Sequence, residues 1–317
     1  MPLHADNARW PALPYAAWKD TLETLHLWTQ IAGKVRLALT PWLNHSWHVA
    51  LYVTARGLST GPIAHQGRDL SLEFDFIDHV LWLRTSDAQI RRLMLKPTSV
   101  AEFYADVMEA LSDLGIAVRI NEMPNEIPNA VPFPDDRAHA SYDRHAVRRF
   151  HRVLLSSHDV FSHFRTGFLG KASPVHFFWG SFDLAVTRFS GRKAPPHPGG
   201  VPNLPDAVAR EAYSHEVSSA GFWPGGGGVI DYPAFYSYAY PAPDGFATAK
   251  VKPGAAFWSK DLGEFILPYE SVRTAREPKA ALMTFLQSTY EAAADLAKWK
   301  REELECGLGE MGKARVV

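Results

Sequence analysis

The chain of 317 residues has one cysteine, no long apolar run and almost no net charge. A single cysteine, Cys306, excludes an internal disulfide and any metal site built from several cysteines, and it fits a reducing cytoplasm. No stretch approaches the roughly 18 consecutive apolar residues of a membrane-spanning helix. The N-terminus also lacks the basic start and apolar run of a signal peptide. We therefore expect a cytoplasmic protein that does not bind a membrane.

The charge balance argues against another class of partner. Lysines and arginines number 33, aspartates and glutamates 34, and the formal net charge is −1. Without an excess of positive charge there is no general electrostatic attraction to nucleic acid, so we expect no nucleic-acid partner. The sequence carries no indication of the oligomeric state.

Aromatic residues and histidines, in contrast, are plentiful: 10 Trp, 18 Phe, 11 Tyr and 14 His. Aromatic side chains can surround a small ligand, but they more often simply fill a core. A small-molecule ligand is therefore an expectation that needs polar groups beside the aromatic ones.

The densest group of aromatic, small and potentially catalytic residues is 174–192, PVHFFWGSFDLAVTRFSGR. Apolar and polar positions alternate after the Gly180-Ser181 break, which predicts a strand with two different faces. One face holds Phe182, Leu184 and Val186, and the other holds Asp183, Ala185 and Thr187. We expect this strand to line a pocket with its polar face.

Periodicity predicts the other elements. Apolar residues at every third or fourth position predict helices over 15–35, 100–114 and 143–168, and one starting at Pro278. Ser99 with Glu102 forms a capping box, and Asp143 can cap the third helix. Alternation predicts a hairpin over 70–84 and strands over 35–39, 48–54, 116–120, 234–240, 247–251 and 263–268.

This order of elements predicts an α+β fold, with a mostly antiparallel sheet flanked by four long helices. Two similar halves, 15–120 and 143–305, could be related by a pseudo-twofold internal repeat. The proline-rich segment 121–142 would link them, after an N-terminal arm over 1–14 and before a frayed tail over 306–317. The cleft between the halves is then the expected pocket.

Three segments resemble a known family: GKVRLALTPWLNHSWHVALYVTARG, HFFWGSFDLAVTRFSGR and AYSHEVSSAGFWPG. They are similar to a bacterial family known only as a domain of unknown function, over about residues 10–305. The resemblance implies a soluble bacterial protein. It implies no activity, cofactor or catalytic residue, so these must come from the residues themselves.

Histidines and carboxylates suggest a metal site. His45 and His48 flank Trp47, and together with His176, or with His215 and Glu216, they could hold a divalent metal. No HExxH pattern is present, however, and histidines bonded to the backbone are the simpler interpretation. Glu73 and Asp75 share a strand face, which is typical of a solvated face as well as of paired catalytic carboxylates.

Charged and glycine-rich segments leave further alternatives. Arg188 and Arg192 could grip a carboxylate or phosphate, or form structural salt bridges. Ser214-His215-Glu216 is not a catalytic triad, because a triad is assembled from distant positions. The glycines at 225–228 could form a mobile lid or a surface loop, and no helix follows them as nucleotide binding would require.

We carry three functional hypotheses. The first is an enzyme that acts on a small organic molecule, and a bound metal ion could assist the reaction. Its acid–base groups would be His176, Asp183 and Glu216. Its ligand would contact Trp47, Trp179, Arg188 and Trp223. Its metal ligands would be His48 and His215. The second is a non-catalytic protein that binds a small molecule in the same pocket, and the third is a protein-interaction module. The cofactor is not indicated.

Overall fold

The computed structural model describes residues 9–228 and 230–315. These residues form seven α-helices and two six-stranded antiparallel sheets, which confirms the α+β prediction. The helices are α2 (Lys19–Leu39), α3 (Val100–Asp113), α4 (Arg144–Thr166), α5 (Asp206–Ala212), α6 (Tyr269–Arg273), α7 (Pro278–Leu296) and α8 (Arg301–Leu304). Four of them, α2, α3, α4 and α7, are the long helices that the sequence predicts.

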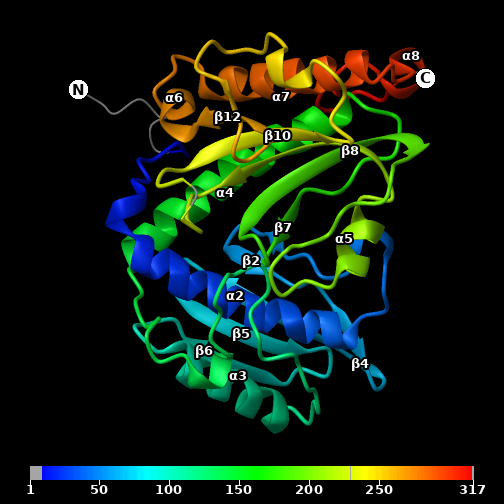
Figure 1. Ribbon diagram of the computed structural model, residues 1–317. Helices are drawn as coiled ribbons and strands as arrows, with labels where there is room; N and C mark the ends of the chain where they lie inside the picture. Colours follow the sequence, from blue (N-terminus) through cyan, green and yellow to red (C-terminus); the bar gives the residue numbers. More distant parts are fainter. Residues whose placement is uncertain (1–8, 229, 316–317) are drawn as a thin grey trace.

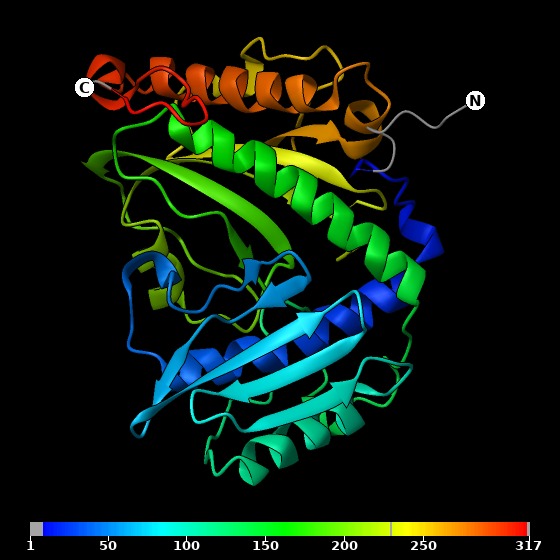
Figure 2. The ribbon, with the colours of Figure 1, turned by 180° about the vertical axis from the view of Figure 1, so that it is seen from behind.

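The first sheet has the strand order β1-β2-β4-β5-β6, with β3 paired to β4. Its strands are β1 (Tyr52–Val53), β2 (Gly57–Ser59), β3 (Ile63–His65), β4 (Arg68–Asp75), β5 (Val80–Thr85) and β6 (Ile90–Met94). Apolar positions alternate along β4, so one face of the sheet is apolar and packs against helices. Phe103 of α3 joins this face to α2, because its ring lies 4.4 Å from Trp28 and 6.3 Å from Phe74. Figure 2 shows α3 at the bottom of the molecule, below this sheet.

The second sheet has the order β11-β12-β10-β9-β8-β7. Its strands are β7 (His176–Phe178), β8 (Asp183–Lys193), β9 (His215–Trp223), β10 (Ala234–Tyr240), β11 (Phe257–Ser259) and β12 (Glu264–Pro268). Strand register aligns Leu184, Phe222, Phe235 and Leu267 in a buried row across the sheet. This apolar face packs against α4 and α7; in Figure 1, α4 runs behind the sheet and α7 lies above it.

The opposite face of the second sheet is polar and carries no helix of the α4–α7 layer. Because alternate residues of a strand point to opposite faces, Asp183 and Thr187 of β8 lie on this side. Ser219 of β9 and Tyr238 of β10 belong to the same cross-strand row as Thr187. The predicted polar face of the strand therefore exists.

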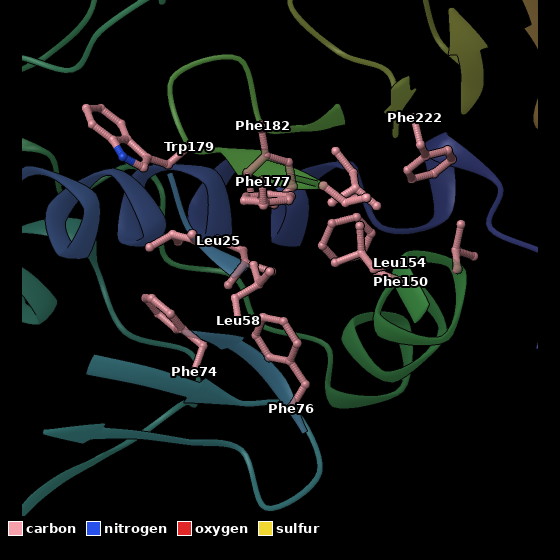
Figure 3. Packing of buried hydrophobic residues seen from close by; sticks show 14 of the residues in the cluster. Leu25, Leu58, Phe74, Phe76, Phe150, Leu154, Phe177, Trp179, Phe182 and Phe222 are labelled. Carbon is pink, nitrogen blue, oxygen red and sulfur yellow. The ribbon is translucent and has the colours of Figure 1, made fainter. Parts of the chain in front are cut away.

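Helix α2 runs between the two sheets, as Figure 1 shows. It is buried on nearly all sides, which is unusual for a helix with charged residues. Leu25 and Trp28 join the common core, while His26, Gln30 and Lys34 follow one another at four-residue spacing on another face. In Figure 3, Leu25, Phe74, Phe150 and Phe177 bring α2, the first sheet, α4 and the second sheet into one apolar cluster.

Several element predictions are confirmed. The hairpin over 70–84 is β4 and β5, and the strands over 234–240 and 263–268 are β10 and β12. Both predicted caps are present: Ser99 and Glu102 form a capping box on α3, and the Asp143 side chain accepts from the first turn of α4. Pro278 opens α7 as predicted.

The strand predicted over 35–39 is wrong, because α2 continues to Leu39 and stops before Pro41. Gly33 does not end the helix: its missing side chain leaves the space that the Trp179 indole fills. No strand occupies 116–120 or 247–251, and the strand predicted over 48–54 shrinks to Tyr52–Val53.

The segment 174–192 is a hairpin of β7 and β8 rather than a single strand. Phe182 sits in the connecting turn with φ 58°, so it precedes the alternating part. Each half of the chain repeats the order helix, strands, helix, but a pseudo-twofold relation and the division at 121–142 stay predictions. The predicted arm over 1–14 and tail over 306–317 extend in part outside the described residues.

Candidate functional site

Two adjoining cavities lie on the polar face of the second sheet, with volumes of about 690 and 750 Å³. They share seven lining residues: Glu126, Gly180, Ser181, Asp183, Tyr213, Tyr236 and Tyr238. We name the first the acidic compartment and the second the aromatic compartment. The shared wall means that a ligand in one compartment lies against groups that also face the other.

Asp183, the first residue of β8, stands in the wall between the compartments and is buried. Its carboxylate accepts hydrogen bonds from the hydroxyls of Ser181 and Tyr236. Burial raises the pKa of Asp183, while these two hydrogen bonds oppose the increase by stabilising the carboxylate. Asp183 is therefore a fixed carboxyl group at the centre of the site.

Tyr236 reaches Asp183 by passing over β9 at a glycine. Gly221 pairs with Tyr236 on one side and with Ala185 on the other. A β-carbon at Gly221 would meet the Tyr236 hydroxyl group. The missing side chain is thus what allows the tyrosine of β10 to contact the carboxylate of β8.

Two further carboxyl groups enter the site from other segments. Glu126 comes from the 121–142 segment and Glu264 from the start of β12, and both are half-buried. Burial, reinforced by the charge of Asp183, raises the pKa of Glu126 to about 7 and that of Glu264 to about 8. Within the described residues, neither side chain has a hydrogen-bonding or ion-pairing partner. Both groups can therefore gain or lose a proton near neutral pH.

Tyrosines supply neutral hydrogen-bond donors. The hydroxyls of Tyr213 and Tyr238 lie 2.8 Å apart, and Tyr236 donates to Asp183. Burial raises the pKa of Tyr213 to about 12 and raises those of Tyr236 and Tyr238 well above the usual tyrosine value. These phenols therefore stay protonated at physiological pH. Because Tyr236 already donates to Asp183, the O–H available for a ligand oxygen is the one that the Tyr213–Tyr238 pair leaves free.

Two histidines also line the acidic compartment. His26 of α2 places Nε2 2.8 Å from the carbonyl oxygen of Gly180, and burial lowers its pKa to about 4. It is therefore a neutral donor that fixes the turn before Asp183. His139 places Nδ1 2.7 Å from a carboxylate oxygen of Asp136, which is itself buried.

The charges around the acidic compartment have one sign. Its described lining residues include the acids Glu23, Glu126, Asp136, Asp183 and Glu264, and no lysine or arginine. The aromatic compartment differs, because Trp47, Trp179 and Phe189 form much of its wall and one lysine, Lys34, reaches it. A ligand spanning both would meet proton-exchanging groups at one end and apolar surface at the other.

Four of the residues predicted for the site line these cavities. Asp183 borders both compartments, Trp47 and Trp179 border the aromatic one, and Trp223 borders the acidic one. The glycines 225–227 also line the acidic compartment, and each has positive φ. Trp179 is held by a 2.8 Å hydrogen bond from Nε1 to the Val49 carbonyl oxygen.

Arg188 lies elsewhere, on the apolar face of the second sheet. Its guanidinium carbon is 3.5 Å from the ring centroid of Phe164 and 4.3 Å from that of Tyr290, and its NH2 donates to the Phe164 carbonyl oxygen. Burial lowers the pKa of Arg188 to about 10. The side chain joins α4, α7 and the sheet, and does not reach either cavity as an anion clamp.

Four other predicted groups are also outside the cavities. Glu216 accepts from Ser190 and Arg192, and His176 is buried among the rings of Trp47, Tyr52 and Phe178. Glu73 and Asp75 pair with Arg84 and Arg56 at the first sheet. The structure therefore does not bring His176 and Glu216 together with Asp183.

The proposed metal ligands are separated as well. His48 packs on Trp42 and accepts from the Leu43 amide, whereas His215 lies against His45 with ring centroids 6.0 Å apart. His45 is engaged by Lys171 and the Ala212 carbonyl oxygen. In residues 9–228 and 230–315, no group of three or more His, Cys, Asp or Glu side chains is placed to hold a metal ion.

Sequence analysis missed most of the polar groups of the site: His26, Lys34, Glu126, Tyr236, Tyr238 and Glu264. Three of them can be recognised from a sequence pattern. The alternation in AFYSYAY places Tyr236 and Tyr238 on one face of a strand, and Lys34 interrupts the apolar surface of a long helix. Glu126 lies in an irregular proline-rich segment, where no periodicity indicates which residues turn inward.

Among the described residues, no helix combines the length and apolar character needed to cross a membrane. Comparison with curated proteins and with solved structures gives no match. One family model matches residues 10–306, nearly the whole chain, and no activity accompanies it. On that match, the chain belongs to a family of unknown function, DUF5996.

Proposed function

We propose that this protein is an enzyme that transfers protons on a small organic molecule bound in the acidic compartment. The observation that carries the proposal is the convergence of three carboxyl groups from separate segments on one cavity. Asp183 is fixed by two hydroxyls, and Glu126 and Glu264 face the same space with pKa values near neutrality. Proton exchange at neutral pH needs groups of this kind.

The three carboxyl groups have different surroundings, which suggests a division of roles. Glu264 and Glu126 exchange protons with the substrate, since a group with a pKa near 7 or 8 is available in both forms. Asp183 holds its orientation through Ser181 and Tyr236 and influences the protonation of both glutamates. Tyr238 can donate a hydrogen bond to a substrate oxygen on which negative charge develops.

The test is a proton-exchange screen in heavy water. The full-length protein is incubated in D₂O with separate panels of amino acids, hydroxy acids, ketones, sugars and amines, followed by proton NMR and mass spectrometry. An acid–base enzyme should incorporate deuterium into one panel member or convert it. The Glu264→Gln variant should lower the rate by about 100-fold or more, because a general acid–base group contributes roughly that much.

Glu109→Gln is the matched control, because Glu109 is exposed on α3, far from the cavity lining. It should leave the exchange rate unchanged. If a panel member binds in the cavity and shifts the melting temperature, yet neither exchanges nor reacts, the enzyme proposal fails and the protein is a binding protein. Equal rates in the wild type and Glu264→Gln would remove the proposed role of Glu264.

A further inference from the structure

A second reactive group faces the site from α2. Lys34 is only 3% exposed, yet its side chain reaches the wall of the aromatic compartment. Nζ donates to the Asn125 side-chain oxygen and lies 5.8 Å from the Trp179 ring centroid. A lysine held between an amide and an indole, inside a cavity of about 750 Å³, is accessible to a ligand but shielded from bulk water.

The charge of Lys34 is not balanced by a contacting carboxylate. Within residues 9–228 and 230–315, no carboxylate forms an ion pair with it. The titratable residues that share its compartment are His45, Glu126, Asp183, Tyr213, Tyr236 and Tyr238. Desolvation by burial lowers the pKa of Lys34 to about 8, so about a tenth of the amine is unprotonated at pH 7 and about half at pH 8.

Asn125, which accepts the hydrogen bond from Lys34, is itself rigidly placed. The side-chain nitrogen of Asn125, Nδ2, donates to the Asn203 carbonyl oxygen at 2.7 Å. This bond orients the side-chain oxygen of Asn125 toward Lys34. The Gln30 side chain forms two hydrogen bonds with the Asn125 backbone. Its Oε1 accepts from the Asn125 N–H at 2.8 Å, and its Nε2 donates to the Asn125 carbonyl oxygen at 2.9 Å. Asn125 is a hydrogen-bond acceptor that positions Nζ without holding it in the charged form as a carboxylate would.

We propose that Lys34 is a nucleophile that forms an imine with an aldehyde or ketone bound across the two compartments. A lysine in an apolar, uncompensated position is the arrangement that activates an amine for this chemistry. Aldehydes and ketones form imines readily with a free amine, whereas the carbonyl groups of esters and amides do not. The inference rests on the proposed acid–base function and adds the substrate class to it.

Side chains of the site can supply and accept every proton that imine formation requires. The unprotonated Nζ attacks the carbonyl carbon, and the C=O π electrons move to oxygen. That oxygen takes up a proton and the nitrogen loses one of its two, which gives a neutral carbinolamine. The nitrogen then loses its remaining proton as C=N forms, and the hydroxyl group leaves as water after a second protonation. Asp183 and Glu126 border the same compartment and can give and accept these protons. No oxidant, reductant or metal is needed.

The apolar wall fits the rest of such a substrate. Trp47, Trp179 and Phe189 provide flat surfaces on the Lys34 side, and the acidic compartment continues beyond Asp183. A carbonyl compound can therefore place its reacting carbon at Lys34 while a polar part extends toward Glu264. Burial of the carbonyl against the indole also limits hydrolysis of the imine by bulk water.

Reductive trapping tests the inference. The full-length protein at pH 8 is mixed separately with pyruvate, dihydroxyacetone and benzaldehyde, then with cyanoborohydride, which reduces an imine to a stable secondary amine. Modification of Lys34 blocks trypsin there, so the peptide 20–36 should appear in place of 20–34, heavier by the probe less one oxygen atom. At this pH an amine of pKa near 8 has roughly 100-fold more free base than an ordinary lysine.

At limiting reagent, at least one probe should label Lys34 at least about tenfold faster than the exposed Lys279 and Lys300. If every probe labels Lys34 no faster than these two residues, the proposal is overturned. This comparison needs only the wild-type protein. Lys34→Arg and Lys34→Met, checked for folding by circular dichroism, should lose the 20–36 adduct while surface labelling persists. An initial rate of total labelling in these variants equal to that of the wild type would also refute it.

The outcomes separate this inference from the proposed function. Deuterium exchange that depends on Glu264, without trapping at Lys34, would leave an acid–base enzyme and remove the imine chemistry. Trapping at Lys34 without any Glu264-dependent exchange would support the nucleophile and remove the acid–base assignment.

Discussion

Gly221 is the residue on which the contact between Tyr236 and Asp183 depends. Replacement by alanine would place a β-carbon against the Tyr236 hydroxyl and 2.5 Å from the Leu184 carbonyl oxygen. The backbone oxygen cannot move aside, so we expect Gly221→Ala to lower the free energy of unfolding by about 2 kcal/mol in urea titrations. Gly254→Ala is the matched control, since a β-carbon there meets open space. Equal stability of the two variants would contradict this account of Gly221.

Glu264 gives the site a measurable dependence on pH. Because its folded-state pKa of about 8 exceeds that of an unfolded glutamate, about 4.3, the folded protein binds this proton more tightly. The free energy of unfolding should therefore fall as pH rises from about 5 to about 8.

Glutamine cannot lose a proton, so Glu264→Gln should become more stable relative to the wild type over that range. We expect the difference to grow by an amount on the order of 1 kcal/mol, measured by urea unfolding at pH 5 and pH 8. Glu109→Gln, an exposed substitution, should show no such growth. A difference that stays constant or shrinks with rising pH would mean that Glu264 is not held as a buried acid.

At the level of single residues, sequence alone found the aromatic walls and Asp183 but not the partner acids. Asp183 is visible because it alternates with apolar residues in a strand. Glu126 and Lys34 are brought to the cavities only by contacts between segments about 90 residues apart, such as Lys34 with Asn125. Patterns within a short window do not contain that information.

At the scale of the elements, the start of α3 could be predicted because its capping residues are close together in the sequence. Ser99 and Glu102 exchange hydrogen bonds at its start, so every donor of the capping box lies within four residues. We expect Ser99→Ala to lower the free energy of unfolding by about 1 kcal/mol. Ser112→Ala, at an exposed position of the same helix, should change it little. Equal losses in urea titrations would show that the cap does not stabilise the helix.

The predicted strand over 35–39 failed for a reason that belongs to the element scale. Val35, Leu37 and Leu39 alternate, but a helix surrounded by protein on nearly all sides buries alternate residues too. Glycine weakens a helix in general, whereas in this fold Gly33 makes room for Trp179. The distinction depends on tertiary packing, which the local pattern does not encode.

At the scale of the whole molecule, one apolar cluster joins the two sheets through α2 and α4. Phe150 of α4 lies at its centre, 5.4 Å from the Phe182 ring and 5.1 Å from the Trp18 ring. We expect Phe150→Ala to lower the free energy of unfolding by about 4 kcal/mol. Because the cluster is continuous, hydrogen exchange should accelerate in both sheets, at β4–β5 and at β9–β10.

Leu155→Ala provides the control on the same helix, because Leu155 is 36% exposed and contributes less to the core. Its effect on exchange should be small in both sheets. Faster exchange confined to β9–β10 in Phe150→Ala would show that the halves unfold separately. That outcome would favour the division into two domains that the sequence suggested.

Strand β8 has the cavities on one side and the apolar core on the other. This arrangement links its pairing register to the substitutions that the strand can accept. A slip of one residue in its pairing would turn Asp183 toward the aromatic core and Leu184 toward the cavity. A buried carboxylate without Ser181 and Tyr236 would cost several kcal/mol, so the misaligned form is disfavoured by the same residues that make the site. Selection for the chemistry of the pocket therefore also selects for correct strand pairing, and substitutions that abolish one can weaken the other.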